Sequence, residues 1–160
     1  MNEIENILKR VRDTKALEFG VGAMKKIPAM FDSLFPGKTA VVVADKITYE
    51  IAGKTVHGYL NDAGINTDQP FVFTDPGLYA EWSYLEQLES YLKERDVIAV
   101  AVGLGVINDL TKLASHHLGR RYIIVGTAAS MDGYTSYGAS VTYHGNKQTF
   151  DCPAPLGMVM

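Results

Sequence analysis

Short apolar runs rich in β-branched residues alternate along this chain with segments whose apolar residues recur at helical spacing. The strand-like runs lie at 39–44, 71–73, 97–102 and 122–125, and the helix-like segments lie at 47–63, 78–94 and 105–118. Strands separated by helices predict an α/β fold. We expect a Rossmann-like, mostly parallel sheet with helices on both faces, because buried parallel strands are continuously apolar.

The two ends of the chain carry other patterns. Residues 1–11 place apolar side chains at positions 4, 7, 8 and 11, which predicts an amphipathic helix rather than a secretion signal. Near the C-terminus, residues 140–144 and 147–150 each mix polar and apolar side chains. They flank Gly145-Asn146, a turn pair that predicts a β-hairpin. Residues 155–160 are mostly apolar and predict the opening of another buried strand. We therefore expect that the natural polypeptide continues past Met160.

Composition narrows the class of protein. A chain of 160 residues that is 47% hydrophobic buries one core, so residues 1–160 are expected to form one domain. The net charge of −3, with acids and bases mixed, argues against a nucleic-acid partner. The lone Cys152 excludes an internal disulfide and favours the cytoplasm. No apolar run reaches the length that membrane insertion requires.

A glycine-containing loop, Gly103-Leu104-Gly105, joins the third predicted strand to its helix. Glycines let a backbone approach a ligand closely, and the first N–H groups of a helix favour an anion. The third glycine of the usual dinucleotide fingerprint is missing. Asp109 and Lys112 follow on the first turns of the helix, where an ordinary surface ion pair explains them equally well. The loop predicts nucleotide binding.

Asp45 ends another predicted strand. A carboxylate at such a position commonly binds the hydroxyls of the adenosine ribose. It also repels a 2′-phosphate, which favours NAD over NADP. The alternative is that Asp45 caps the helix that begins near Ile47. The residues alone leave both interpretations open.

Residues 127–136 follow the fourth strand and share its carboxyl edge with the glycine loop. Their small and hydroxyl side chains suit a flat ring or a phosphate, and the carboxylate of Asp132 suits the hydroxyls of a polyol. The alternative is a polar turn whose side chains bond to the local backbone. The chain's histidines show no spacing that is typical of a metal site.

Together, the glycine loop, residues 127–136 and the predicted hairpin resemble the sn-glycerol-1-phosphate dehydrogenases, most closely the bacterial nickel- or zinc-dependent branch. These belong with glycerol dehydrogenases and dehydroquinate synthases in the iron-alcohol-dehydrogenase-like superfamily. The resemblance runs from residues 19–22 through 43–49 to 152–157, and residues 128–136 are its most specific part. Two departures are Leu104 within the usual glycine triplet and Gly126 where a proline often stands.

The resemblance implies an enzyme that reduces dihydroxyacetone phosphate to sn-glycerol 1-phosphate with NADH or NADPH, a step of phospholipid biosynthesis. It implies that Asp132 contacts the substrate and that Asp45 holds the adenosine ribose. The residues implied in binding the diphosphate are Gly103, Gly105, Val106, Ile107, Asn108 and Asp109. Those implied in lining the rest of the cofactor are Thr127, Ala128, Ala129, Ser130 and Ser136.

In the family that it resembles, the catalytic nickel or zinc is held by an aspartate and two histidines in a C-terminal helical domain. Those ligands would fall after Met160, so no metal ligand is expected in this chain. A metal of this kind polarises the substrate carbonyl. We expect this N-terminal portion to bind NAD(H) weakly and to turn over nothing alone. The surface that docks the helical domain should also favour self-association, as in a homodimer.

Two alternatives stay open at this stage. One is a polyol dehydrogenase of the same superfamily that acts on unphosphorylated glycerol. The other is a non-catalytic nucleotide-binding module, which needs no metal domain.

Overall fold

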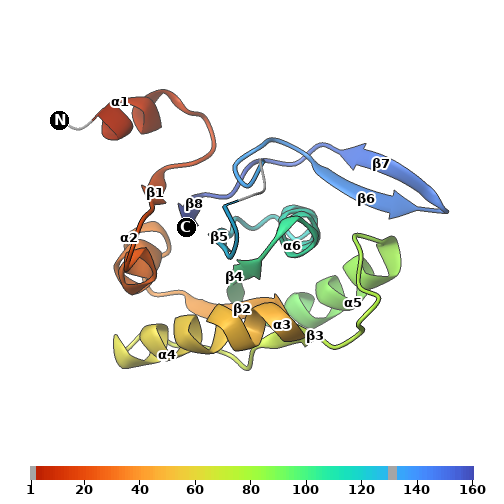
Figure 1. Ribbon diagram of the computed structural model, residues 1–160, viewed down its shortest axis with the longest axis horizontal. Helices are drawn as coiled ribbons and strands as arrows, with labels where there is room; N and C mark the ends of the chain where they lie inside the picture. The colour runs from red at the N-terminus through yellow and green to blue at the C-terminus, as the bar shows by residue number, and fades with distance from the viewer. Residues whose placement is uncertain (1–2, 130–132) are drawn as a thin grey trace.

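A six-stranded parallel sheet forms the centre of the structure (Figure 1). The computed structural model describes residues 3–129 and 133–160. The strands of the sheet are β1 (Ala16–Glu18), β2 (Thr39–Asp45), β3 (Phe71–Phe73), β4 (Val97–Gly103), β5 (Ile123–Gly126) and β8 (Gly157–Val159). Their order across the sheet is β1-β8-β5-β4-β2-β3. The predicted parallel α/β fold is therefore confirmed.

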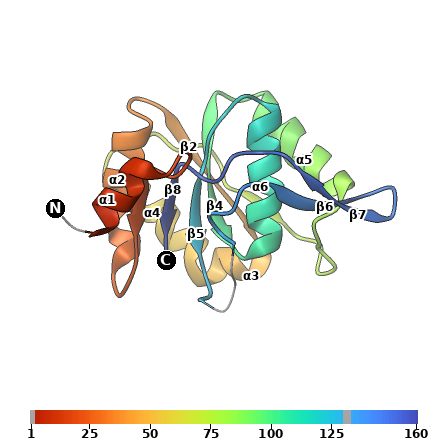
Figure 2. The ribbon, with the colours of Figure 1, turned by 90° about the horizontal axis from the view of Figure 1, so that it is seen from above.

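Helices cover both faces of this sheet (Figure 2). One face packs against α5 (Trp82–Lys93) and α6 (Gly105–His117), and the other packs against α2 (Ile27–Leu34) and α4 (Lys54–Asp62). Strand β2 shows the reason, because Val41 and Val43 point to the first face while Val42 points to the second. A strand buried on both faces has no polar side, so its sequence is apolar throughout.

The helix predicted at 47–63 is three consecutive pieces in the structure. These are α3 (Lys46–Thr48), a π-helical turn η2 (Tyr49–Gly53) and α4. The ring of Tyr49 lies against the backbone of Gly53, where a Cβ atom would come within 2.6 Å of the ring. Helix α5 begins at Trp82, four residues later than the predicted start at 78, because Glu81 caps it by accepting the Ser83 N–H.

The sequence pattern of the first forty residues did not predict several helices and strands that the structure contains. Strand β1, the 3₁₀ turn η1 (Ala23–Lys26) and α2 were not predicted. The predicted N-terminal helix is present as α1 (Glu3–Arg10), and Ile7 on it is 52% exposed. The buried strand predicted at the C-terminus is present as β8, between β1 and β5. None of the helices in the described part of the chain is both long and apolar enough to cross a membrane.

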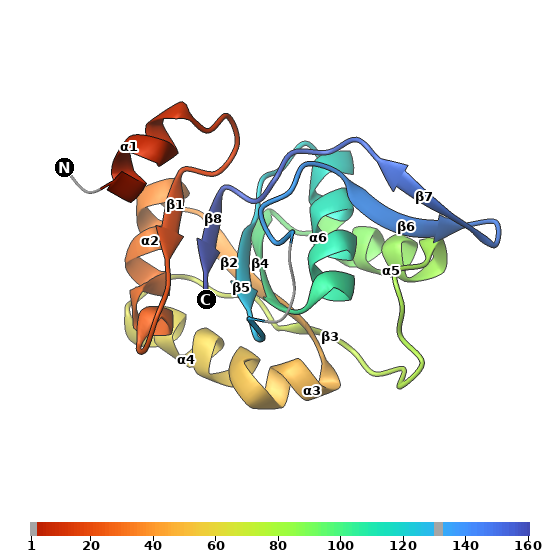
Figure 3. The ribbon, with the colours of Figure 1, turned by 45° about the horizontal axis from the view of Figure 1, so that its top comes forward.

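The predicted hairpin is formed by β6 (Ala139–Tyr143) and β7 (Asn146–Phe150), which extend beyond α6 and α5 (Figure 3). Its turn differs from the prediction by one residue. Tyr143 pairs with Asn146, so the turn residues are His144 and Gly145, not Gly145 and Asn146. Both have positive φ, 49° and 77°, which the tight primed turns of hairpins require.

Gly103 is expected to be essential to the packing of α6 on the sheet. A Cβ atom on Gly103 would lie 2.9 Å from two side-chain atoms of the buried Ile107. We therefore expect Gly103→Ala to lower the free energy of unfolding by about 1–3 kcal/mol, since overpacked cores relax only in part. Urea denaturation followed by circular dichroism measures this change.

Gly58→Ala is the matched control, because nothing lies within 4 Å of a Cβ atom at this position on α4. Alanine is the better helix former, so this variant is expected to gain about 0.5–1 kcal/mol. Equal effects of the two substitutions would contradict the packing role of Gly103.

Candidate functional site

The register of the sheet brings three predicted site segments to one edge. Ala44 pairs with Val102 and Gly103 pairs with Gly126, so the carboxyl ends of β2, β4 and β5 lie side by side. From β2 the chain passes outward to β3, and from β4 it passes the other way to β5. The crevice between β2 and β4 is thus the point where the strand order reverses, which is where parallel α/β sheets bind ligands.

The N-terminus of α6 opens at this crevice. Leu104 is its N-cap residue, and the first helical hydrogen bond runs from the Asn108 N–H to the Leu104 carbonyl at 2.9 Å. The N–H groups of Gly105, Val106 and Ile107 precede that bond, so they have no acceptor within the helix. Such groups, aligned with the helix dipole, favour an anion. Binding of a diphosphate by this loop stays a prediction.

Leu104 does not close this loop. Its side chain is 42% exposed and lines a cavity of about 410 Å³ at the ends of β2, β3 and β4. The walls of this cavity are mainly apolar. The lining residues include Asp45, Ile47, Phe73, Thr74, Asp75, Leu78, Leu104 and Val106.

Asp45 lies at the rim of that cavity and caps α3. Its Oδ1 atom accepts the Thr48 N–H at 2.8 Å, and the Thr48 hydroxyl accepts the Asp45 N–H at 3.2 Å. The capping interpretation is therefore confirmed. Asp45 also faces the crevice beside Leu104, so its predicted contact with a ribose is compatible with the cap and stays a prediction.

The surface ion pair considered for Asp109 and Lys112 is wrong. Lys112 is only 1% exposed, and its Nζ atom donates to the carbonyls of Ser136 at 2.7 Å and Gly138 at 2.9 Å. Burial lowers the pKa of Lys112, and the nearby Asp109 carboxylate opposes that change. Burial likewise raises the pKa of Asp109, against the effects of Lys112 and the Ser140 N–H.

Asn108 is also buried and bonded within the protein. Its Nδ2 atom donates to the Tyr134 carbonyl at 3.1 Å, and its Oδ1 atom accepts the Tyr122 hydroxyl at 2.5 Å. The side chains of Asn108 and Asp109 thus hold neighbouring segments together. Their predicted contacts with a diphosphate stay predictions.

The segment after β5 returns toward the glycine loop. The Thr127 N–H donates to the Gly103 carbonyl at 3.3 Å, and the Tyr134 hydroxyl donates to the Ala128 carbonyl at 3.0 Å. Gly126 leaves room for the Tyr134 ring, since a Cβ atom there would lie 2.9 Å from it. Sequence reasoning missed Tyr134, although its place within the most specific part of the resemblance was a signal.

The remaining predicted residues of this segment divide into two groups. The Ser136 hydroxyl donates to the Gly133 carbonyl at 2.8 Å, as in the polar turn considered as an alternative. Ala129 is exposed next to Ala128. Ser130 and Asp132 lie outside the described residues, so their roles stay predictions.

Exposed apolar side chains gather at the same edge. Of the ten large hydrophobic residues exposed in the described part of the chain, six follow the carboxyl ends of strands: Phe19, Val21, Ile47, Ile51, Leu104 and Met160. A second cavity, of about 260 Å³, lies among them and is lined in part by Gly20, Ile51, Gly126 and Thr127. Apolar surface concentrated in this way marks an interaction site.

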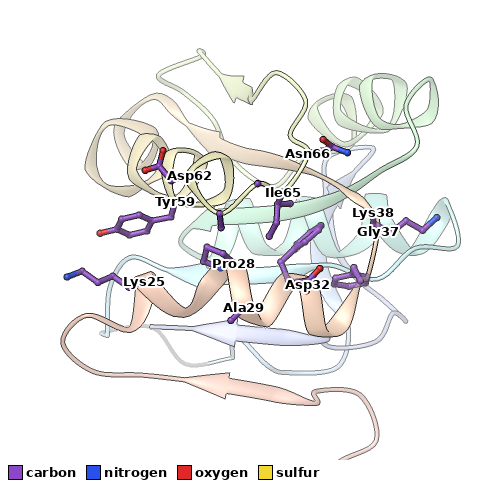
Figure 4. A pocket seen from close by; sticks show the side chains of 14 residues that line it. Lys25, Pro28, Ala29, Asp32, Gly37, Lys38, Tyr59, Asp62, Ile65 and Asn66 are labelled. Carbon is purple, nitrogen blue, oxygen red and sulfur yellow. The ribbon is translucent and has the colours of Figure 1, made fainter.

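A larger cavity of about 690 Å³ lies elsewhere, between α2 and α4 (Figure 4). It is lined by Pro28, Asp32 and Tyr59, and it extends to Lys38 and Asn66 at the amino end of β2. That is the edge opposite to the one where sheets of this kind bind ligands. No predicted site residue lines it.

Within residues 3–129 and 133–160, no group of three His, Cys, Asp or Glu side chains is placed to hold a metal ion. The metal implied by the resemblance stays a prediction.

Comparison with known proteins agrees with this geometry. Over 121 residues the chain is 40% identical to a glycerol-1-phosphate dehydrogenase [NAD(P)+] of Halalkalibacterium halodurans, a match that covers 73% of this chain and 30% of that protein. It is 34% identical to the enzyme of the same name from Methanosarcina mazei, over 88% of this chain and 38% of that protein. The chain thus spans about a third of the length of these relatives.

Solved structures show the same fold. An iron-containing alcohol dehydrogenase from Thermococcus thioreducens superimposes with a TM-score of 0.77 at 13% identity, over 90% of this chain and 44% of that one. A probable glycerol dehydrogenase from Sinorhizobium meliloti superimposes with a TM-score of 0.72 at 24% identity, over 91% of this chain and 38% of that one.

The fold defines the chain as a Rossmann-like α/β structure in which the N-terminus of α6 opens at the carboxyl edge of the sheet. The family model for iron-containing alcohol dehydrogenases matches residues 18–160. The chain belongs to the iron-containing alcohol dehydrogenase family.

Cys152 provides a probe of how tightly the region behind this site is closed. Its side chain is buried, and burial raises the pKa of the thiol to about 11. Roughly one thousandth of the thiol is then ionised at pH 8, so we expect almost no reaction with iodoacetamide in the folded chain. Labelling with and without urea, read by mass spectrometry, tests this, and fast labelling of the folded chain would contradict it.

The raised pKa of Cys152 also makes the free energy of unfolding depend on pH. The folded state holds the thiol proton more tightly than the unfolded state, whose ordinary pKa is 9.0. The contribution of this group is therefore complete below that value and is lost as the pH rises toward about 11.

Proposed function

We propose that this chain binds NAD(H) or NADP(H), with NAD preferred, as the cofactor-binding part of a glycerol-1-phosphate dehydrogenase. The observation that carries the proposal is that the Asp45 cavity, the α6 N-terminus and the segment after β5 meet at one edge of the sheet. The relatives named above support the same reaction class. The reaction proposed is reduction of dihydroxyacetone phosphate to sn-glycerol 1-phosphate.

Each part of a dinucleotide has a plausible partner along this edge. The apolar walls formed by Phe73, Leu78 and Leu104 suit an adenine ring, and Asp45 suits the ribose hydroxyls. The N–H groups at the start of α6 suit the diphosphate. Thr127 and Ala128 would then line the nicotinamide, which would supply the hydride for the carbonyl carbon of the substrate.

The remaining proposals follow from the resemblance. Asp132 would bind the hydroxyl groups of the substrate, and a nickel or zinc ion held by other residues would polarise its carbonyl. The exposed apolar side chains at this edge would meet the domain that carries the metal, or a second copy of the chain. The natural protein is proposed to act in the cytoplasm.

Asp45→Asn tests the proposed choice of cofactor. Asparagine caps a helix as well as aspartate does, so α3 is retained while the negative charge is removed. We expect the ratio of the NADPH and NADH dissociation constants to fall roughly tenfold, because a single charge near a 2′-phosphate contributes on this scale. Titrations followed by the change in the fluorescence of the reduced nicotinamide on binding measure both dissociation constants.

Asp96→Asn is the matched control for charge. Asp96 lies before β4 at the opposite edge of the sheet, where it pairs with Lys38 at 3.7 Å. This variant is expected to keep the original preference between the cofactors. An unchanged ratio in Asp45→Asn would contradict the ribose contact.

The reaction itself is tested by NADH oxidation at 340 nm. We expect the 160-residue chain alone to show no turnover, and a polypeptide that also carries the metal-binding domain to reduce dihydroxyacetone phosphate. Dihydroxyacetone is the matched substrate without the phosphate. A preference for dihydroxyacetone would favour a polyol dehydrogenase instead. Efficient turnover by the 160-residue chain alone would contradict the proposal that it is only the cofactor-binding part of the enzyme.

A further inference from the structure

Helix α6 carries most of the buried polar side chains of the described residues. Six polar or charged side chains are buried there in all, and four of them, Asn108, Thr111, Lys112 and Ser115, lie on this one helix. A core helix on a parallel sheet needs no such groups for packing. Since burying polar groups is costly unless they are bonded, their partners reveal what they hold.

Two of these four side chains, Asn108 and Lys112, donate to backbone carbonyls of a single segment, residues 134–140, and Asn108 also accepts the Tyr122 hydroxyl. Within the described part of the chain, the Thr111 hydroxyl has no hydrogen-bond partner. Asn108 donates to the carbonyl of residue 134, and Lys112 donates to the carbonyls of residues 136 and 138. The carboxylate of Asp109 accepts the N–H of residue 140. The contacts fall on alternate residues, so α6 fixes the path of this segment by its backbone, whatever side chains the segment carries.

Lys112 is the centre of this arrangement. Its ammonium group is buried with Asp109 and Cys152 as the charged or titratable neighbours that act on it. A methionine of similar length would fill the same space without the cost of burying a charge. Core stability alone therefore does not account for a lysine here. Two hydrogen bonds to fixed carbonyls account for it, because they specify one conformation of the segment.

The held segment is continuous with the proposed nicotinamide end of the site. The Tyr134 hydroxyl donates to the carbonyl of Ala128, so fixing residues 134–140 also holds Ala128 in place. The same helix presents the N–H groups of Gly105 and Val106 at the proposed diphosphate end. One rigid element thus links the two ends of the proposed cofactor site.

We propose that Lys112 is a positioning residue, which sets the nicotinamide end of the site relative to the diphosphate end by tying residues 134–140 to α6. This rests on the cofactor site proposed above. Lys112 does not touch the cofactor. It acts through the backbone of Ser136 and Gly138.

The test compares binding of NADH with binding of ADP, which contains only the adenosine and diphosphate half of the cofactor. In Lys112→Met we expect the dissociation constant of NADH to rise about tenfold, in keeping with the loss of two buried hydrogen bonds. That of ADP should stay within about twofold, because the start of α6 and the Asp45 cavity are untouched. Titration calorimetry of the 160-residue chain gives both constants.

Lys54→Met is the matched control, since Lys54 is exposed on α4 and forms an ion pair with Glu50. It should change neither constant. Tyr122→Phe is a second, milder variant that removes the hydroxyl holding the Asn108 amide. Tyr122→Phe should weaken the binding of NADH more than the binding of ADP. It serves as the test if circular dichroism shows that Lys112→Met does not fold.

The outcomes separate the two proposals. Equal loss of NADH and ADP binding in the folded variants would show a merely structural role and overturn the inference, as would no loss of either. If the unaltered chain bound neither NADH nor ADP, the proposed cofactor site itself would be wrong, and the inference would fall with it.

Discussion

The placement of α6 against β4 is the contact on which the carboxyl edge of the sheet depends. Gly103 permits it, because its missing side chain leaves room for Ile107 directly above the end of the strand. The helix then begins within two residues of the sheet, and its first N–H groups open at the crevice between β2 and β4. A side chain at position 103 would push the helix away and move these N–H groups from the crevice.

From this helix, structural constraint spreads in two directions. Its apolar face buries Leu110 and Leu113 against the sheet, and its polar residues hold the backbone that follows β5. Two different kinds of interaction therefore act on one element. Apolar burial is non-directional and sets how closely the helix lies on the sheet. The hydrogen bonds from Asn108 and Lys112 are directional, so they set the path of the segment beside it.

The same edge carries most of the large hydrophobic side chains that are exposed in the described residues. Leu104, Ile47 and Met160 are exposed around cavities lined by Asp45 on one side of β4 and by Thr127 on the other. A sheet whose faces are covered by helices, but whose carboxyl edge presents apolar side chains, is arranged to meet something at that edge. In the function proposed above, this surface lies beside the bound cofactor.

Local patterns were sufficient for the central strands, for α6 and for the site segments at their ends. Apolar runs of strand length and a glycine before a helical repeat are local signals, because burial on both faces and close backbone approach each leave a mark on adjacent residues. Strand β1 and α2 gave no such signal. A three-residue edge strand is stabilised by pairing with β8, a partner more than a hundred residues away.

Tertiary structure alone decided the roles of the polar residues on α6. Asp109 and Lys112 stand three apart in a helix, which equally fits a solvated ion pair. Only the folded chain brings the carbonyls of Ser136 and Gly138 to the lysine and so makes its burial tolerable. The sequence by itself determined where the strands end and which residues gather there. Which of those residues face a ligand, and which hold the backbone in place, depended on partners distant in the chain.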